Sequence, residues 1–178
     1  MKVSKLLFIG IVASVFFVFS SYSFAGEVYS PQSGEFQIEF PSEYAESLSK
    51  LENDTLGTVG SVGQNSMYFL KYGLPVTKMP KDVRGKFLQE VKQAEVADAE
   101  ILNEQLYQSD TFDALRFEVN YGKDSEYQKK FFKIIVSEKF WLVMSVNQMS
   151  SESLSPETIN QFMDSVKVNQ PATDQNNS

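Results

Sequence analysis

The sequence predicts an α+β domain in which helices pack on an antiparallel sheet. Residues 35–41 alternate apolar and polar side chains, which is typical of a half-buried strand. Residues 82–97 repeat apolar side chains at steps of three and four, the period of an amphipathic helix. Four strand-like segments with short links occupy 101–146, and short links favour antiparallel neighbours. The order strand, strand, helix, four strands, helix is that of an α+β domain.

The first two strands are bounded by turn residues. Pro41 stops the first, and Gly73 and Pro75 end the second, which covers residues 67–72. Between them, residues 57–63 (Gly-Thr-Val-Gly-Ser-Val-Gly) lack the GxGxxG spacing of a dinucleotide site. We expect a weak strand or a mobile loop there.

The helix at 82–97 is expected to cover the sheet with one apolar stripe. Its members are Val83, Phe87, Leu88, Val91 and Ala94. Gly85 in the first turn costs about 1 kcal/mol relative to alanine, which weakens the start of the helix. A stripe of this kind indicates core packing rather than a cofactor site.

The second half of the domain contains the four strands and a last helix. The expected strands are residues 101–107, 114–121, 128–137 and 140–146. The last of them is apolar on both faces, so we place it at the centre of the sheet. Ser155, Pro156 and Glu157 have the pattern of a helix start, with a cap, a proline at the first position and an early acid. The buried stripe of that helix is expected to be Ile159, Phe162, Met163 and Val166.

The N-terminus has the three-part layout of a secretory signal peptide. Lys2 and Lys5 precede an uncharged apolar run, and Ser23-Phe24-Ala25 provides small residues before an expected cut between Ala25 and Gly26. The run is shorter than the ~20 residues of a membrane-spanning helix, although an uncleaved anchor is the alternative. We therefore expect a signal peptide at 1–25, one domain at 26–168, a disordered polar tail at 169–178, and a periplasmic or secreted location.

Composition excludes several classes of partner and chemistry. Without Lys2 and Lys5, 14 basic residues face 23 acidic ones, a net charge of about −9 that disfavours nucleic acid and anionic lipid. The chain has no cysteine, so it offers no residue for lipid attachment, and no stable membrane insertion is expected after cleavage. It has no histidine either, which removes Ser-His-Asp and Cys-His pairs and the usual zinc ligand sets. We expect no enzyme activity, no cofactor and no metal.

Two groups of basic residues are candidate binding sites. Lys129, Lys130 and Lys133 form a local basic cluster, which fits either a docking patch for an acidic partner or the protection of an edge strand against aggregation. Arg116 lies two residues from Glu118 on one strand face. It fits either an anchor for a carboxylate ligand or an arginine paired with a neighbouring acid.

The acidic residues Glu95, Asp98, Glu100 and Glu104 are close in sequence. A hydrolase would need two carboxyl groups ~5–10 Å apart in one cleft. We interpret the cluster as a solvated face, and it lacks the EF-hand pattern of a calcium loop.

The mature chain resembles the PsbP-like group, named for an extrinsic subunit of photosystem II. The matching stretches are residues 34–41, 72–75, 82–97, 101–118 with Arg116-Phe117-Glu118, 140–146 and 162–166. The resemblance implies an α/β/α sandwich, with a central twisted antiparallel sheet flanked by helices. It also implies non-enzymatic roles, such as binding a large membrane complex or, for a nuclear import factor of similar fold, a small GTPase. No site residue is carried over from the family.

The function expected from these features is that of a secreted, non-enzymatic accessory protein that binds another envelope protein or complex. The alternative is a carrier of a small apolar or lipid ligand, which would need a pocket of several hundred Å³ lined by Phe and Tyr. A carboxylate hydrolase is the third hypothesis, and it requires two acids in one cleft with separated pKa values.

Overall fold

The computed structural model describes most of the expected domain. The described residues are 26–51, 54–63, 65–96, 99–121, 129–149 and 154–169. The predicted signal peptide and residues 170–178 of the predicted tail lie outside them. Asn169, the first residue of that tail, is described: its side-chain amide donates to Gly34 O at 2.6 Å and its backbone N–H to Glu35 O at 2.9 Å.

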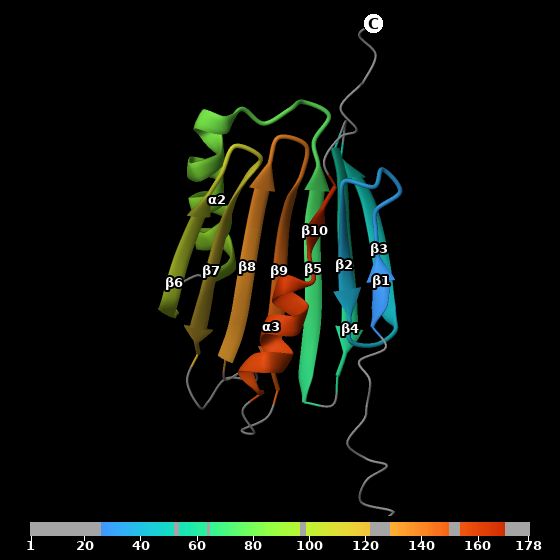
Figure 1. Ribbon diagram of the computed structural model, residues 1–178, viewed down its shortest axis with the longest axis vertical. Helices are drawn as coiled ribbons and strands as arrows, with labels where there is room; N and C mark the ends of the chain where they lie inside the picture. The colour runs from blue at the N-terminus through green and yellow to red at the C-terminus, as the bar shows by residue number, and fades with distance from the viewer. Residues whose placement is uncertain are drawn as a thin grey trace, which may run out of the picture.

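The largest element is a seven-stranded antiparallel sheet (Figure 1). Its strands are β3 (Tyr44–Leu51), β4 (Asp54–Val62), β5 (Ser66–Leu74), β6 (Glu100–Gln108), β7 (Phe112–Asn120), β8 (Lys129–Ser137) and β9 (Trp141–Gln148). They are arranged in the order β3-β4-β5-β9-β8-β7-β6. The apolar strand β9 is therefore the middle strand, as its sequence predicts.

A second, three-stranded sheet covers part of one face of the large sheet. It consists of β1 (Glu27–Tyr29), β2 (Phe36–Phe40) and β10 (Lys167–Val168), in the order β1-β2-β10. Helix α3 (Pro156–Asp164) lies on the same face, and helix α2 (Lys81–Val96) lies on the opposite face against β7 and β8 (Figure 1). Each face thus has its own apolar cluster.

The predicted fold class, an α+β domain built as an α/β/α sandwich with a central sheet flanked by helices, is wrong. The structure is β-rich, with two antiparallel sheets and only two short helices in the described residues. The layer on the α3 face is formed largely by β1, β2 and β10. Strand β3 has no counterpart among the predicted strands, because it is an edge strand with exposed side chains, and β4 is predicted only as a weak strand or a mobile loop at 57–63, because it carries glycines in place of alternating apolar residues.

The two helices agree with the sequence to different degrees. In α3, Ser155 caps the first turn by accepting the Thr158 N–H at 3.1 Å, and Ile159, Phe162 and Met163 are buried as predicted. In α2 the buried residues are Arg84, Leu88 and Val96, whereas Val83 and Ala94 of the predicted stripe are exposed. The helix is rotated relative to its apolar stripe, so that a buried arginine shares the face of Leu88.

A tyrosine–carboxylate cluster links the small sheet to the large one. The hydroxyl of Tyr29 in β1 donates to Glu46 of β3 and lies 2.6 Å from the hydroxyl of Tyr72 in β5. Tyr72 also bonds to Glu46, at 3.2 Å. Burial, followed by the hydrogen bond to Glu46, raises the pKa of Tyr29 far above its usual value, and burial also raises the pKa of Tyr72. Both hydroxyls therefore stay protonated and bonded at neutral pH.

The described ranges contain no helix suited to crossing a membrane. Neither α2 nor α3 combines the length and the apolar character that a transmembrane helix requires.

Candidate functional site

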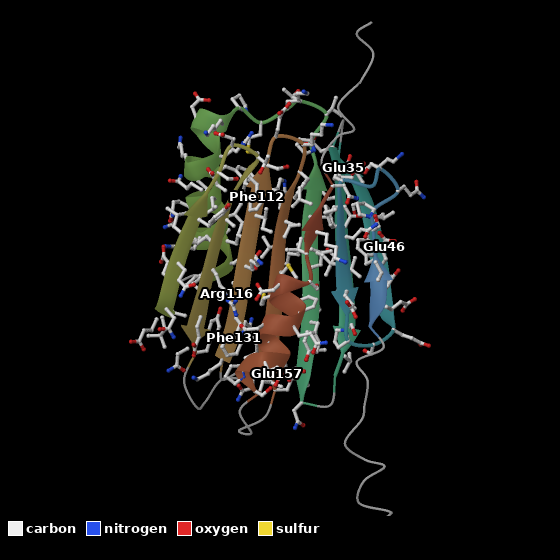
Figure 2. The ribbon with its side chains drawn as sticks, viewed as in Figure 1. Glu35, Glu46, Phe112, Arg116, Phe131 and Glu157 are labelled. Carbon is white, nitrogen blue, oxygen red and sulfur yellow. The ribbon has the colours of Figure 1, made fainter. Side chains whose placement is uncertain are left out.

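An open groove of about 510 Å³ lies on the α3 face of the large sheet. Its floor is formed by β6, β7 and β8, and the start of α3 forms one wall. Figure 2 shows Arg116 and Phe131 on neighbouring strands, with Glu157 of α3 beside them. The residues that line the groove are Asn103, Gln105, Arg116, Phe117, Glu118, Lys129, Phe131, Gln148, Leu154, Pro156, Ile159 and Asn160.

The pairing of β7 with β8 brings the groove's charged residues onto one face. Arg116 is opposite Lys133, Glu118 is opposite Phe131, and Asn120 is opposite Lys129. Because side chains alternate between faces along a strand, residues 129, 131 and 133 of β8 share the face of Arg116 and Glu118. The groove therefore combines cations, a carboxylate and an aromatic ring.

The three lysines of the predicted basic cluster do not form one patch. Lys129 and Lys133 face the groove and α3, whereas Lys130 points to the α2 face, where its ammonium lies 5.0 Å from the centre of the Tyr121 ring. The three lysines do not protect an edge strand either. Strand β8 is an interior strand, because it is hydrogen-bonded to β7 on one side and to β9 on the other.

The lysines on the groove face are bonded within the protein. Lys129 Nζ lies 2.8 Å from Glu118 Oε1. Lys133 Nζ donates to Met163 O at 2.7 Å and to Asp164 Oδ1 at 3.1 Å, and so holds the last turn of α3 to β8. Lysine at a helix C-terminus also interacts favourably with the free carbonyl groups there. These bonds neutralise much of the charge that an acidic partner would meet.

Arg116 is also partly engaged. Its guanidinium donates to Asn160 Oδ1, and Nη1 lies 3.7 Å from Asp164 Oδ1. The pairing interpretation therefore describes part of its role. A third of its side chain is still exposed at the groove. Because a guanidinium carries five N–H donors, further donors remain for a bound group.

Four amide side chains in the groove were missed by the sequence analysis: Asn103, Gln105, Gln148 and Asn160. Asn103 lies at an irregularity of the β6–β7 pairing, has a φ of 54° and donates to Glu118 Oε2 at 3.2 Å. Asparagine tolerates a positive φ better than most residues, but nothing in the local sequence announces a bulge here. The other three come from three separate elements, so only tertiary structure brings them together.

Two of the four acidic residues that are close in sequence, which we interpreted as a solvated face, are paired with lysines. Glu95 binds Lys71 at 2.8 Å, and Glu104 binds Lys92 at 2.9 Å. Asp98 lies outside the described residues. Within those residues, no cluster of three or more acidic side chains is arranged to hold a metal ion.

Comparisons with known proteins give no family. No model of a known protein family matches the sequence, and no curated protein matches it. A crystal structure of a protein from Bacteroides thetaiotaomicron VPI-5482 at 1.50 Å resolution is similar over 82% of this chain, at 14% identity and a TM-score of 0.47. This chain spans about half of that protein, covering 49% of its length. We draw neither fold nor function from that likeness, and the resemblance to the PsbP-like group stays a prediction.

Proposed function

We propose that this protein is a non-enzymatic binding protein, exported by its predicted signal peptide, whose groove between α3 and β6–β8 holds a segment of a partner protein. The observation that carries the proposal is the lining of the groove. Four amide side chains, Arg116 and Glu118 line the groove together with two apolar side chains, Phe131 on the floor and Ile159 on the α3 wall. An extended or looped peptide presents the matching groups, namely backbone N–H and C=O groups and occasional apolar side chains.

The amide side chains favour a peptide over a strongly charged partner. An Asn or Gln side chain carries both an acceptor and donors, as a peptide group does. Asn160 Oδ1 already accepts from Arg116 and Asn103 already donates to Glu118, and Gln105 is an exposed amide of the floor. The cations of the groove are largely balanced by Glu118 and Asp164, so the surface is not strongly basic. This differs from the acidic-partner docking patch that the lysine cluster alone suggested.

A carrier of apolar or lipid ligands is less well supported. Such a carrier needs an apolar pocket lined by Phe and Tyr. The aromatic side chains between the sheets instead pack on one another, as Tyr68 and Phe40 do against Phe162 with ring centroids 5.2 and 5.3 Å away. The groove itself is open and lined mainly by polar groups.

The proposal is tested by site-specific photo-crosslinking in the cells that make the protein. A benzophenone amino acid replaces Gln105, which is exposed and lines the groove. The matched control carries it in place of Thr58, an exposed β4 residue on the opposite face of the sheet. We expect one discrete protein adduct from position 105 and none from position 58.

A second variant links the adduct to the chemistry of the groove. Arg116→Gln removes the guanidinium but keeps a shorter polar side chain, and it should weaken the adduct at position 105 without changing the circular dichroism spectrum. Equal adducts from both positions, or no adduct together with a small molecule retained in native mass spectrometry, would overturn the proposal.

A further inference from the structure

A second cavity, of about 200 Å³, lies at the end of the sheet away from the groove. It is bounded by the hairpin between β8 and β9, the hairpin between β6 and β7, and the ends of β2 and β10. In Figure 2, Glu35 marks this end of the molecule, and Arg116 and Phe131 mark the other. Its lining is Glu35, Arg84, Asp110, Thr111, Ser137, Glu138, Lys139, Phe140, Val168 and Asn169.

Arg84 is the unusual residue in this cavity. It extends from the first turn of α2, and only 4% of it is exposed. Its Nη1 donates to Asp110 O at 3.2 Å, but its Nε is enclosed and has no hydrogen-bond acceptor among the described residues. A buried polar group without a partner is destabilising, and a buried charged one more so. A ligand with an acceptor atom near Arg84 would therefore supply the hydrogen bond that this guanidinium lacks.

The geometry of the guanidinium indicates which ligand. With Nη1 bonded to the hairpin and Nε without an acceptor among the described residues, the edge that carries an unmet donor is the one formed by Nε and Nη2. That edge carries two parallel N–H groups, which match the two oxygens of a carboxylate. Since Nε is closed to water, we expect the guanidinium to turn slightly into the cavity when a carboxylate binds.

The neighbouring groups restrict the charge and shape of the ligand. Two acids of the rim are paired with lysines, Glu138 with Lys78 and Asp110 with Lys81, and the third, Glu35, accepts a hydrogen bond from the hydroxyl of Ser33. The hydroxyl of Ser137 is bonded to Phe140 O at 3.1 Å, so it is not free to bind a ligand as a donor. Further negative charges on a ligand would meet the acids of the rim, whereas an apolar group would lie against Phe140 and Val168.

We propose that this cavity binds a small monocarboxylate that carries a short apolar group, with Arg84 as the bidentate anchor. The volume corresponds to about seven water-sized units at ~30 Å³ each, which suits an acid of roughly seven to nine heavy atoms. The ligand is either a free carboxylic acid or an α-amino acid, since both present the same carboxylate. This site is separate from the groove and does not depend on the proposed peptide partner.

The test uses 4-methylpentanoate as the probe, with 4-methylpentanamide as its uncharged analogue and leucine as the amino-acid arm. Binding is followed by amide chemical shifts in the full mature protein. We expect saturable shifts around residues 137–140 with the acid and none with the amide. Leucine binding as well as or better than the acid identifies the ligand as an amino acid; binding by the acid alone identifies a simple carboxylate.

Two variants separate binding from folding. Arg84→Met keeps a long apolar stem and removes the guanidinium, and it should weaken the acid at least about tenfold, the scale of a lost hydrogen bond to a charged group. Thr111→Phe places a ring at the mouth of the cavity from an exposed hairpin position, leaves Arg84 in place, and should also block binding. No saturable shifts with either carboxylate, or equal binding by the amide, would overturn the proposal whatever the groove does.

Discussion

Gly57 is a position at which one methyl group should damage the fold. A β-carbon at this residue of β4 would lie 2.1 Å from the ring of Tyr72, which is directly opposite in β5. Ordinary carbon contacts are about 3.5 Å, so the ring would have to move by about 1.4 Å. Gly57 does not have a positive φ, which means that close approach of the ring, and not backbone conformation, requires the glycine.

The ring of Tyr72 has little freedom to move. It is 1% exposed, packs edge-on against Phe36 at 5.4 Å, and bonds through its hydroxyl to Tyr29 and Glu46. Overpacking costs about 1–3 kcal/mol and each weakened hydrogen bond about 1 kcal/mol, whereas replacing a strand glycine returns about 0.5–1 kcal/mol. We expect Gly57→Ala to lower the free energy of unfolding by about 2–4 kcal/mol.

The assay is urea denaturation followed by the fluorescence of Trp141, the single tryptophan of the chain. For slopes of about 1–3 kcal/mol per molar urea, the midpoint should fall by at least about 0.7 M. The matched control is Gly60→Ala, whose β-carbon would lie 3.3 Å from the half-exposed Phe69 ring and should change stability by less than about 1 kcal/mol.

A double mutant tests the cause directly. With Tyr72→Leu in place, adding Gly57→Ala should cost almost nothing, because the ring that the methyl group would hit is gone. Wild-type stability of Gly57→Ala, or losses from the two substitutions that simply add, would refute the steric explanation.

Three further predictions follow from single contacts. Ser155→Ala removes the cap of α3 and should lower the free energy of unfolding by about 1 kcal/mol, and Ser49→Ala, at an exposed position of β3, is the mutational control. Lys133→Met frees Met163 O and should cost about 1 kcal/mol or more, compared with less than that for Lys130→Met; equal effects in thermal melts would contradict the α3 anchor. Because the folded pKa of Tyr29 is raised, its contribution to stability is fully present below pH 10, the usual tyrosine value, and is lost as pH rises above it. The free energy of unfolding should therefore fall less steeply with pH above pH 10 in Tyr29→Phe than in the wild type. Urea midpoints measured across pH give both dependences, and equal dependences would argue against the cluster.

Local sequence patterns predict the helices and strands in which the spacing of apolar or capping residues follows from which side chains are buried. The alternation of Phe36, Ile38 and Phe40 places β2, the uniformly apolar run gives the central β9, and Ser155-Pro156 places the start of α3. In each case the residues themselves carry the reason, because side chains repeat every two residues in a strand and a capping hydroxyl acts within one turn.

The elements missed have no such local signal. Strand β3 is exposed along most of its length, and its pairing with β4 depends on backbone hydrogen bonds that any residue can make. Gly57 makes the sequence of β4 look less like a strand. The glycine is required because the ring of Tyr72 in β5 lies against it, and the local sequence of β4 does not reveal that contact. These two strands widen the large sheet, and β1 and β10 join β2 in a second sheet on the α3 face, so that the fold is β-rich and not an α/β/α sandwich.

The sequence alone determined the composition, the lack of histidine and cysteine and hence of Ser-His-Asp pairs, Cys-His pairs and the usual zinc ligand sets, and most of the buried strands. Only the tertiary structure decided the sites. It separated Lys130 from Lys129 and Lys133 by the alternation of β8, gathered amides from β6, β9 and α3 around Arg116, and buried Arg84 beneath two hairpins. The physical reason is that a binding site joins residues distant in the chain, whereas sequence periodicity reports only on each element's own faces.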